Sequence, residues 1–240
     1  MIKYIFFDLD GTLLGMDDKK FVETYLYFIH KGCFDENKFS LKESSYIIYQ
    51  SLNKTIGDLE SNQTNLEKYY KYFKEYVGEE NFNGYLDKFN KFYESSLFDK
   101  CKDSTFVNQN MVAAISYLKD RGYKLVIATN PFFPKLAIEK RIKWANLDIN
   151  DFEFVTFGEE SHYLKPHLEY YLEILKKLNI ENSSEVMMVG NDVEEDMVSS
   201  KLGFETYLVT DCMLSRYGCE NKVKNKGTSS DFLVYVKENL

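Results

Sequence analysis

Two aspartates at the end of a short apolar run are the most chemically suggestive feature of this chain. The stretch "YIFFDLDGTLL", residues 4–14, begins as a buried strand, reaches Asp8 and Asp10, and continues into turn residues. Buried carboxylates are costly unless they are paired or bound to a metal ion. Two of them at the tip of a strand therefore indicate a chemical site.

Further polar residues follow other predicted strands. Thr129 and Asn130 come directly after "YKLVIA", Asp192 and Asp196 follow "EVMMVG", and Lys165 lies in the loop after "FEFVTF". Alternating strands and helices predict a parallel sheet, and ligands bind at the carboxyl ends of such strands. We therefore expect four carboxylates, a hydroxyl, an amide and one lysine to converge on one edge of the sheet.

Four acids in one place repel one another, and a hard divalent cation with oxygen ligands relieves that repulsion. Mg²⁺ is the natural choice, and no histidine cluster favours zinc. A metal ion together with Lys165 makes an anion site that suits phosphate. Asp8 is then a candidate nucleophile toward phosphorus, and Asp10 a candidate acid and base for the leaving oxygen and for water.

The predicted elements divide the chain into two domains. A Rossmann-like α/β core with a parallel sheet is expected from residues 1–14 and 105–240, and an all-helical domain from residues 15–104 is inserted into it. Apolar stripes predict inserted helices around residues 21–29, 41–52, 66–77 and 82–93. In the core we expect strands at 4–7, 123–129, 152–157, 185–190 and 204–209, helices at 111–118, 134–145, 168–175 and 194–202, a loop at 211–228 and a helix from Ser230.

Composition limits the partners and the location. The chain has 240 residues and a formal charge of −8, which argues against nucleic acid or an anionic membrane as the main partner. No apolar run approaches the ~20 residues that span a bilayer, and Asp8 interrupts the first run too early for a signal peptide. We expect a cytoplasmic protein with reduced cysteines (Cys33, Cys101, Cys212, Cys219).

Four short motifs resemble those of a known family. "DLDGT", "ATN", "LKP" and "GNDVEED", in that order, resemble the motifs of the haloacid dehalogenase superfamily over Ile2–Thr12 and about Asn108–Val209. The resemblance implies a Rossmann-like core and Mg²⁺-dependent phosphoryl transfer through an aspartyl-phosphate. The inserted helices resemble the cap that one subclass places between its first two motifs.

The resemblance also implies roles for the site residues. Asp8 is the nucleophile, Asp10 the general acid and base, Thr129 and Asn130 hold phosphoryl oxygens, and Lys165 neutralises charge on Asp8 and the phosphoryl group. The Asp8 carboxylate, the Asp10 carbonyl and Asp192 bind the metal ion, and Asp196 supports them. Family members often have aspartate directly after the glycine of the last motif, where this chain has Asn191, so either Asp192 or Asp196 could be the direct ligand; we favour Asp192.

The sequence thus predicts a Mg²⁺-dependent phosphatase that acts on a small phosphorylated metabolite. A 2-haloacid dehalogenase resembles such enzymes but lacks the second acid of the first motif, so Asp10 argues against it. A phosphomutase often needs a cationic group for a distal phosphate, and residues 15–105 contain no arginine. A non-catalytic binding module would carry unused buried acids at a cost in stability. The substrate, the cap residues that set specificity and the oligomeric state stay open.

Overall fold

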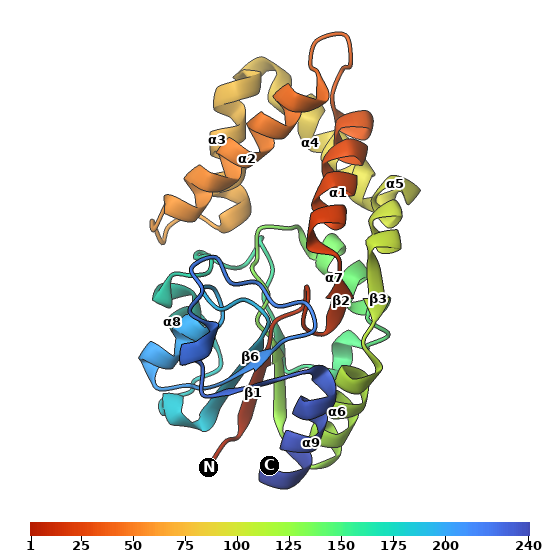
Figure 1. The fold of residues 1–240 in the computed structure, drawn as a ribbon. Helices are drawn as coiled ribbons and strands as arrows, with labels where there is room; N and C mark the ends of the chain where they lie inside the picture. Colours follow the sequence, from red (N-terminus) through yellow and green to blue (C-terminus); the bar gives the residue numbers. More distant parts are fainter.

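The computed structural model describes residues 1–240 and contains a six-stranded sheet in which every pair of neighbouring strands is parallel (Figure 1). The strand order is β5-β4-β1-β6-β7-β8. The strands are β1 (Tyr4–Phe7), β4 (Lys124–Ile127), β5 (Phe154–Val155), β6 (Val186–Gly190), β7 (Glu205–Val209) and β8 (Asn225–Gly227). The predicted α/β class with a Rossmann-like parallel sheet is confirmed.

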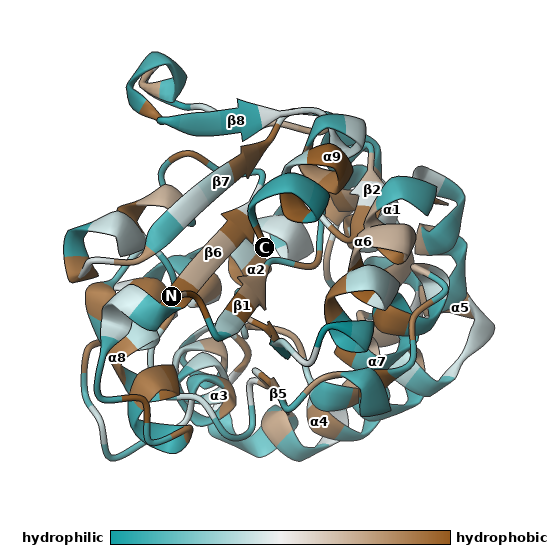
Figure 2. Cartoon of the chain, turned by 90° about the horizontal axis from the view of Figure 1, so that it is seen from below, coloured by the Kyte–Doolittle hydropathy of each residue, from teal (hydrophilic) through white to brown (hydrophobic).

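Helices cover both faces of this sheet. Ile5 and Phe7 of β1 point into a core shared with α6 (Gln109–Asp120), α7 (Lys135–Trp144) and α9 (Ser229–Asn239), whereas Phe6 packs with α8 (Leu168–Lys177) on the other face. The central strands are accordingly apolar in Figure 2, while the edge strand β8 is hydrophilic. A strand buried on both faces needs a continuous apolar run, which is what "YIFF" supplies.

The inserted helices follow a short two-stranded ribbon. β2 (Leu14–Met16) pairs antiparallel with β3 (Thr105–Val107), so the two ends of the insertion lie side by side. Between them come α1 (Asp18–Cys33), α2 (Leu41–Gly57), α3 (Asn65–Val77), α4 (Glu79–Glu94), α5 (Ser96–Asp99) and a 3₁₀ turn (Lys100–Ser104). Figure 1 shows these helices beyond the carboxyl ends of the strands. The ribbon itself was not predicted, because three-residue strands carry no readable alternation.

A second contact joins the insertion to the core, at the start of α3. The Asn65 backbone N–H donates to the Ser161 carbonyl at 2.8 Å, and its side-chain amide donates to the Tyr163 carbonyl at 3.0 Å. The fully buried Lys68 donates through Nζ to the carbonyls of Asp58 at 2.8 Å and His162 at 2.7 Å. The helices are therefore tied to the loop that leads into Lys165.

One predicted helix is confirmed only in part. We expected a helix at residues 194–202, but turns occupy the first residues and only Met197–Leu202 are helical, as a 3₁₀ helix. The Asp192 side chain accepts the backbone N–H groups of Glu194 and Glu195, both at 2.9 Å, and such local bonds compete with helix formation. The strand expected at 152–157 is confirmed only over two residues, and β8 lies in the expected loop 211–228.

Candidate active site

The carboxyl ends of β4, β1 and β6 are neighbours, and the residues predicted from the sequence meet there. They border a cavity of about 240 Å³ between the sheet edge and helices α1 and α2. Its lining includes six of the seven predicted site residues: Asp8, Asp10, Thr129, Asn130, Asp192 and Asp196. The seventh, Lys165, is buried beside them and contacts two of the acids. This convergence places the polar groups where the strand order switches direction on either side of β1.

Lys165 lies between two carboxylates. Its Nζ donates to Asp8 Oδ1 at 2.9 Å and to Asp196 Oδ1 at 2.6 Å, and its side chain is 1% exposed. Burial alone lowers the pKa of this ammonium, but the carboxylates of Asp196 and Asp8 outweigh it, so the pKa is raised well above its ordinary value. Lys165 therefore keeps its charge. Asp8 Oδ2 has no hydrogen-bond partner in the protein and stays available to a ligand.

Asp196 uses both oxygens within the protein. Oδ1 accepts from Lys165, and Oδ2 accepts the backbone N–H of Asp192 at 3.0 Å. Burial raises the pKa of this carboxyl to about 8, although Lys165 opposes the shift. Gly190 is required directly before this turn, because a Cβ there would lie 2.1 Å from Asp196 Oδ2. Asp196 is thus placed to hold Lys165 and the loop.

Asp10 has a partner that the sequence did not reveal. Arg141 of α7 is fully buried and pairs through Nη1 with Asp10 Oδ2, while its Nε donates to the Ala137 carbonyl at 3.2 Å. The guanidinium carbon stacks 4.3 Å from the centroid of the Phe133 ring. Burial raises the pKa of the Asp10 carboxyl, and the Arg141 charge opposes that rise. Arg141 therefore fixes the orientation of the Asp10 side chain at the edge of the cavity.

The side chain of Asn130 braces the loop of Lys165. Asn130 Oδ1 accepts the Lys165 backbone N–H at 3.2 Å, and Nδ2 donates to Glu195 Oε2 at 3.0 Å. The Thr129 carbonyl accepts hydroxyls from Tyr170 at 2.7 Å and Thr156 at 2.8 Å. The Thr129 hydroxyl makes no hydrogen bond within the protein and borders the cavity. These bonds hold the end of β4 rigidly beside Asp8.

Unused backbone donors lie at the same strand ends. The N–H groups of Leu9, Asp10 and Asn130 donate to no acceptor in the protein. Buried backbone donors are normally paired, so free ones that border a cavity offer sites for an anion. With Lys165 they form a set of donors that suits phosphoryl oxygens.

Asp192 and two neighbouring acids share a second arginine. Arg216 Nη1 lies 2.8 Å from Asp192 Oδ2 and 3.6 Å from Glu194 Oε2, and Nη2 lies 3.4 Å from Glu195 Oε1. Burial, reinforced by the nearby Asp192 charge, raises the pKa of Glu195 to about 7. One arginine against three carboxylates leaves this side of the cavity negative.

Asn191, which stands where family members often have aspartate, bonds to the first motif and to the loop after β7. Its Oδ1 accepts the Thr12 hydroxyl at 2.9 Å, and its Nδ2 donates to the Cys212 carbonyl at 2.8 Å. Gly11 has φ +80°, and a Cβ there would lie 2.2 Å from Asn191 Nδ2. The amide therefore joins the first and last motifs, a role that needs a donor and an acceptor at once.

The oxygen donors at the end of β1 fit Mg²⁺. The Asp10 carbonyl accepts no hydrogen bond and Asp8 Oδ1 accepts only that of Lys165, so each has a lone pair available to a cation while Asp8 Oδ2 stays free. No group of three acidic, histidine or cysteine side chains lies close enough together to hold a metal ion without other donors. Mg²⁺ needs only one or two carboxylates and keeps several waters, so the oxygen donors at the end of β1 fit this ion.

Comparison with known proteins now identifies the family. A family model described as haloacid dehalogenase-like hydrolase matches residues 2–201. The chain therefore belongs to the haloacid dehalogenase-like hydrolases, as its motifs predict. No curated protein sequence matches the chain.

Solved structures share the fold at low identity. An HAD phosphatase from Thermococcus onnurineus has a TM-score of 0.63 at 17% identity, over 99% of this chain and 98% of that chain. The L-2-haloacid dehalogenase from Xanthobacter autotrophicus has a TM-score of 0.57 at 14% identity, over 100% of both chains. Because the names of these two proteins indicate different reactions, the shared fold does not decide between reactions at phosphorus and carbon.

The sequence prediction missed Arg141, Arg216 and Glu195. The chain has only three arginines, Arg121, Arg141 and Arg216, and two of them contact site acids. Scarcity was therefore a usable signal, since arginine is the residue best suited to buried ion pairs. The structure also has no helix long and apolar enough to cross a membrane, and its four cysteines are unpaired.

Proposed function

We propose that this protein is a Mg²⁺-dependent phosphatase that hydrolyses a small phosphate monoester through an aspartyl-phosphate on Asp8. The observation that carries the proposal is the state of the Asp8 carboxylate. One oxygen is held by the buried ammonium of Lys165, and the other is free beside the cavity. A carboxylate that is oriented and desolvated in this way is suited to attack phosphorus.

The first step transfers the phosphoryl group. Asp8 Oδ2 forms a bond to phosphorus, the bond from phosphorus to the ester oxygen breaks, and Asp10 donates a proton to that leaving oxygen. The raised pKa of Asp10 favours the protonated form that this step requires. Arg141 keeps the carboxyl in place while its protonation state changes.

The second step releases phosphate. Asp10, now ionised, takes a proton from water, and the water oxygen attacks phosphorus while the bond to Asp8 breaks. Phosphoryl oxygens are held by the free N–H groups of Leu9, Asp10 and Asn130 and by the Thr129 hydroxyl. Lys165 offsets the negative charge throughout.

Three groups are proposed to hold Mg²⁺: the Asp8 carboxylate, the Asp10 carbonyl and the Asp192 carboxylate. The ion would supply positive charge to the phosphoryl oxygens. Asp192 Oδ2 is paired with Arg216 in this structure, so metal binding through that oxygen requires the ion pair to open. Asp196 is already bonded through both oxygens, which favours Asp192 as the direct ligand.

Two rival reactions fit the site less well. A dehalogenase has no leaving oxygen to protonate, so it has no use for Asp10. A phosphomutase often binds a distal phosphate through a cation of its cap, and no lysine or arginine from the inserted helices lines the cavity. We propose that residues 15–104 act as the cap of a hydrolase, covering the site from above.

An assay with p-nitrophenyl phosphate tests the proposal. The purified protein is expected to release nitrophenolate with Mg²⁺, to lose the activity in EDTA, and to regain it when Mg²⁺ is restored. Mg²⁺ should also raise the melting temperature, because a ligand that binds only the folded state stabilises it. Full activity in the chelator would rule out the metal, and no activity with any phosphate ester would rule out the phosphatase.

A further inference from the structure

The two sides of the cavity differ in chemistry. We call the strand-end residues Asp8, Asp10, Asp192, Asp196 and Lys165 the floor, and the lining residues from the inserted helices the roof. The roof consists of Phe21, Val22, Tyr25 and Leu26 of α1 and Ile48, Tyr49 and Leu52 of α2, with Asp18 at the start of α1. Its only charged member is an acid.

We propose that the substrate's leaving group is an uncharged, largely apolar alcohol of a few carbon atoms that packs against this roof. The inference rests on the proposed phosphatase function and names its substrate class. A second anionic group on the substrate would face the acid of the roof, and the roof itself has no lysine or arginine to offset that charge. An apolar group instead gains from leaving water against seven aliphatic and aromatic side chains.

Arg216 is no substitute for a cation in the roof. It is the one arginine of the lining, but it is already paired with Asp192, Glu194 and Glu195. Even when Mg²⁺ binds Asp192, Arg216 still faces Glu194 and Glu195, so recruiting it for a carboxylate or phosphate of the substrate would leave these two acids without their counter-charge. The cavity therefore has no free cation for an anionic leaving group, and an apolar leaving group needs none.

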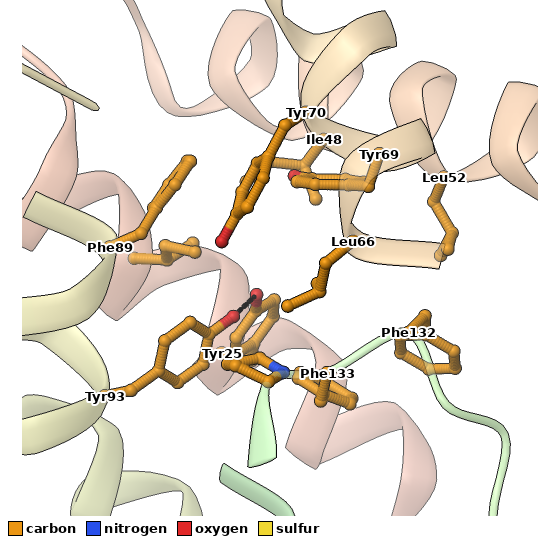
Figure 3. Close-up of a pocket in the computed structure, with 12 residues that line it drawn as sticks. Tyr25, Ile48, Leu52, Leu66, Tyr69, Tyr70, Phe89, Tyr93, Phe132 and Phe133 are labelled. Atoms are coloured by element: carbon orange, nitrogen blue, oxygen red, sulfur yellow. Dashed lines mark hydrogen bonds between the residues drawn. The ribbon is translucent and has the colours of Figure 1, made fainter. Parts of the chain in front are cut away.

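The apolar lining continues beyond this cavity. A second, smaller cavity of about 50 Å³ shares Tyr25, Ile48, Leu52, Phe132 and Phe133 with the first (Figure 3). Eleven of its twelve lining residues are hydrophobic, and the Tyr25 hydroxyl is already bonded to that of Tyr93 at 2.7 Å. An apolar leaving group that extends into this second cavity thus meets no charged side chain.

Binding of unreactive phosphonates separates the two proposals. Calorimetry with Mg²⁺ present would compare methylphosphonate with butylphosphonate, 3-phosphonopropionate and 3-aminopropylphosphonate, which have similar length but carry no charge, a carboxylate or an ammonium at the far end. We expect butylphosphonate to bind at least tenfold more tightly than methylphosphonate, since each added buried methylene contributes up to about fourfold. The two charged analogues should bind at least about tenfold more weakly than butylphosphonate.

Variants of the roof then locate the effect. Leu52→Asn is expected to remove the advantage of butylphosphonate while leaving methylphosphonate binding unchanged. Leu41→Asn, on the same helix but outside the lining, should keep the full advantage. If Leu52→Asn does not fold, the near-isosteric Val22→Thr should reduce the advantage about threefold, in proportion to the lost methyl contact.

The binding results distinguish a failure of the apolar subsite from a failure of the phosphatase proposal. If methylphosphonate binds but butylphosphonate binds no better, the apolar subsite is wrong and the phosphatase stands. Tighter binding of 3-phosphonopropionate or of 3-aminopropylphosphonate would replace the apolar alcohol with an anionic or cationic one. If no phosphonate binds and p-nitrophenyl phosphate is not hydrolysed, both proposals fall together.

Discussion

The floor and the roof of the cavity are built on opposite principles. In the floor, Lys165 bonds to both Asp8 and Asp196, and Asp192 pairs with Arg216. Asp192 and Asp196 also accept backbone N–H groups. In the roof, the lining is apolar and the contacts have no direction. A floor of compensated charges cannot lose one member without leaving another unpaired, whereas a roof can change shape at modest cost. We therefore expect substitutions in the floor to have far larger effects on turnover.

The largest effect is expected for Asp8→Asn. The amide is nearly isosteric and still accepts the Lys165 hydrogen bond, but it is a poor nucleophile, so turnover of p-nitrophenyl phosphate should fall by at least about 1,000-fold while the melting temperature changes little. Asp18→Asn is the matched control, because Asp18 lines the same cavity from the roof. Retention of more than a thousandth of wild-type turnover, with contamination excluded, would end the assignment of Asp8.

A smaller loss is expected when the partner of Asp10 is removed. Arg141→Met should lower kcat by about 10- to 100-fold with little change in KM, because Asp10 is then no longer held in place. The Arg141 charge lowers the pKa of Asp10, so its removal should raise that pKa further. The acid limb of the kcat profile, where Asp10 must be ionised to accept a proton from water, should move to higher pH.

The exposed Arg121→Met is the control for the loss of an arginine, since Arg121 lies on the surface and stacks on Tyr117. Its pH profile should match that of the wild type. A profile for Arg141→Met that falls uniformly, without a shift of the acid limb, would mean that Arg141 supports the fold and does not act on Asp10.

The contrast between floor and roof also shows what the sequence can predict. Asp8, Asp10, Thr129 and Asp192 were placed correctly at the sheet edge because each comes one to three residues after an apolar strand, and the strands of a parallel sheet end together. Arg141 follows no strand. It reaches Asp10 from a helix that starts several residues after β4, and only the packing of α7 on the sheet brings the two groups together.

The residues of the roof show the same limit of prediction from sequence. The apolar stripe of α1 predicted a helix, but the stripe does not say which members face another helix and which face the site. Phe21 and Tyr25 line the cavity whereas Ile29, on the same stripe, lines only the smaller cavity behind it. The helix expected at 194–202 forms only from Met197 onward, as a 3₁₀ helix, because Asp192 accepts the backbone N–H groups of Glu194 and Glu195.

The attachment of the roof can be loosened without touching the floor. Lys68→Met removes the buried ammonium that bonds the carbonyls of Asp58 and His162, and leaving these acceptors unpaired costs about 1–3 kcal/mol. Amide hydrogen exchange should accelerate around residues 58–68 and 158–167, and the melting temperature should fall by several degrees.

Lys71→Met is the matched control. Lys71 also faces Asp58, at 3.5 Å, but its side chain is 48% exposed, and exposed ion pairs contribute little. If both variants exchange at the same rate as the wild type, the Lys68 bonds do not hold the inserted helices to the core, and other contacts such as the β2–β3 ribbon and the Lys140–Asp99 ion pair do.

The smallest effect is expected on stability, from the three carboxylates of Asp192, Glu194 and Glu195 that share Arg216. Burial raises the pKa of Glu195 to about 7 from its ordinary 4.5. Between these two values the folded protein binds a proton that the unfolded chain has released, so the free energy of unfolding should decrease as pH rises through this window. In metal-free protein, Glu195→Gln should flatten the dependence of melting temperature on pH between about 4.5 and 7, and should raise stability above pH 7.

Glu43→Gln is the control of opposite sign, because the side-chain and backbone hydrogen bonds of Ser40 lower the pKa of Glu43. That change should cost stability above pH 4.5, and the cost should shrink as pH falls below 4.5 and Glu43 becomes protonated in the folded protein. Added Mg²⁺ should also weaken the pH dependence of the wild type, since a cation neutralises the acids that burial disfavours. An unchanged slope in Glu195→Gln would show that Arg216 already balances the three acids, and that the negative side of the cavity does not cost the fold any stability.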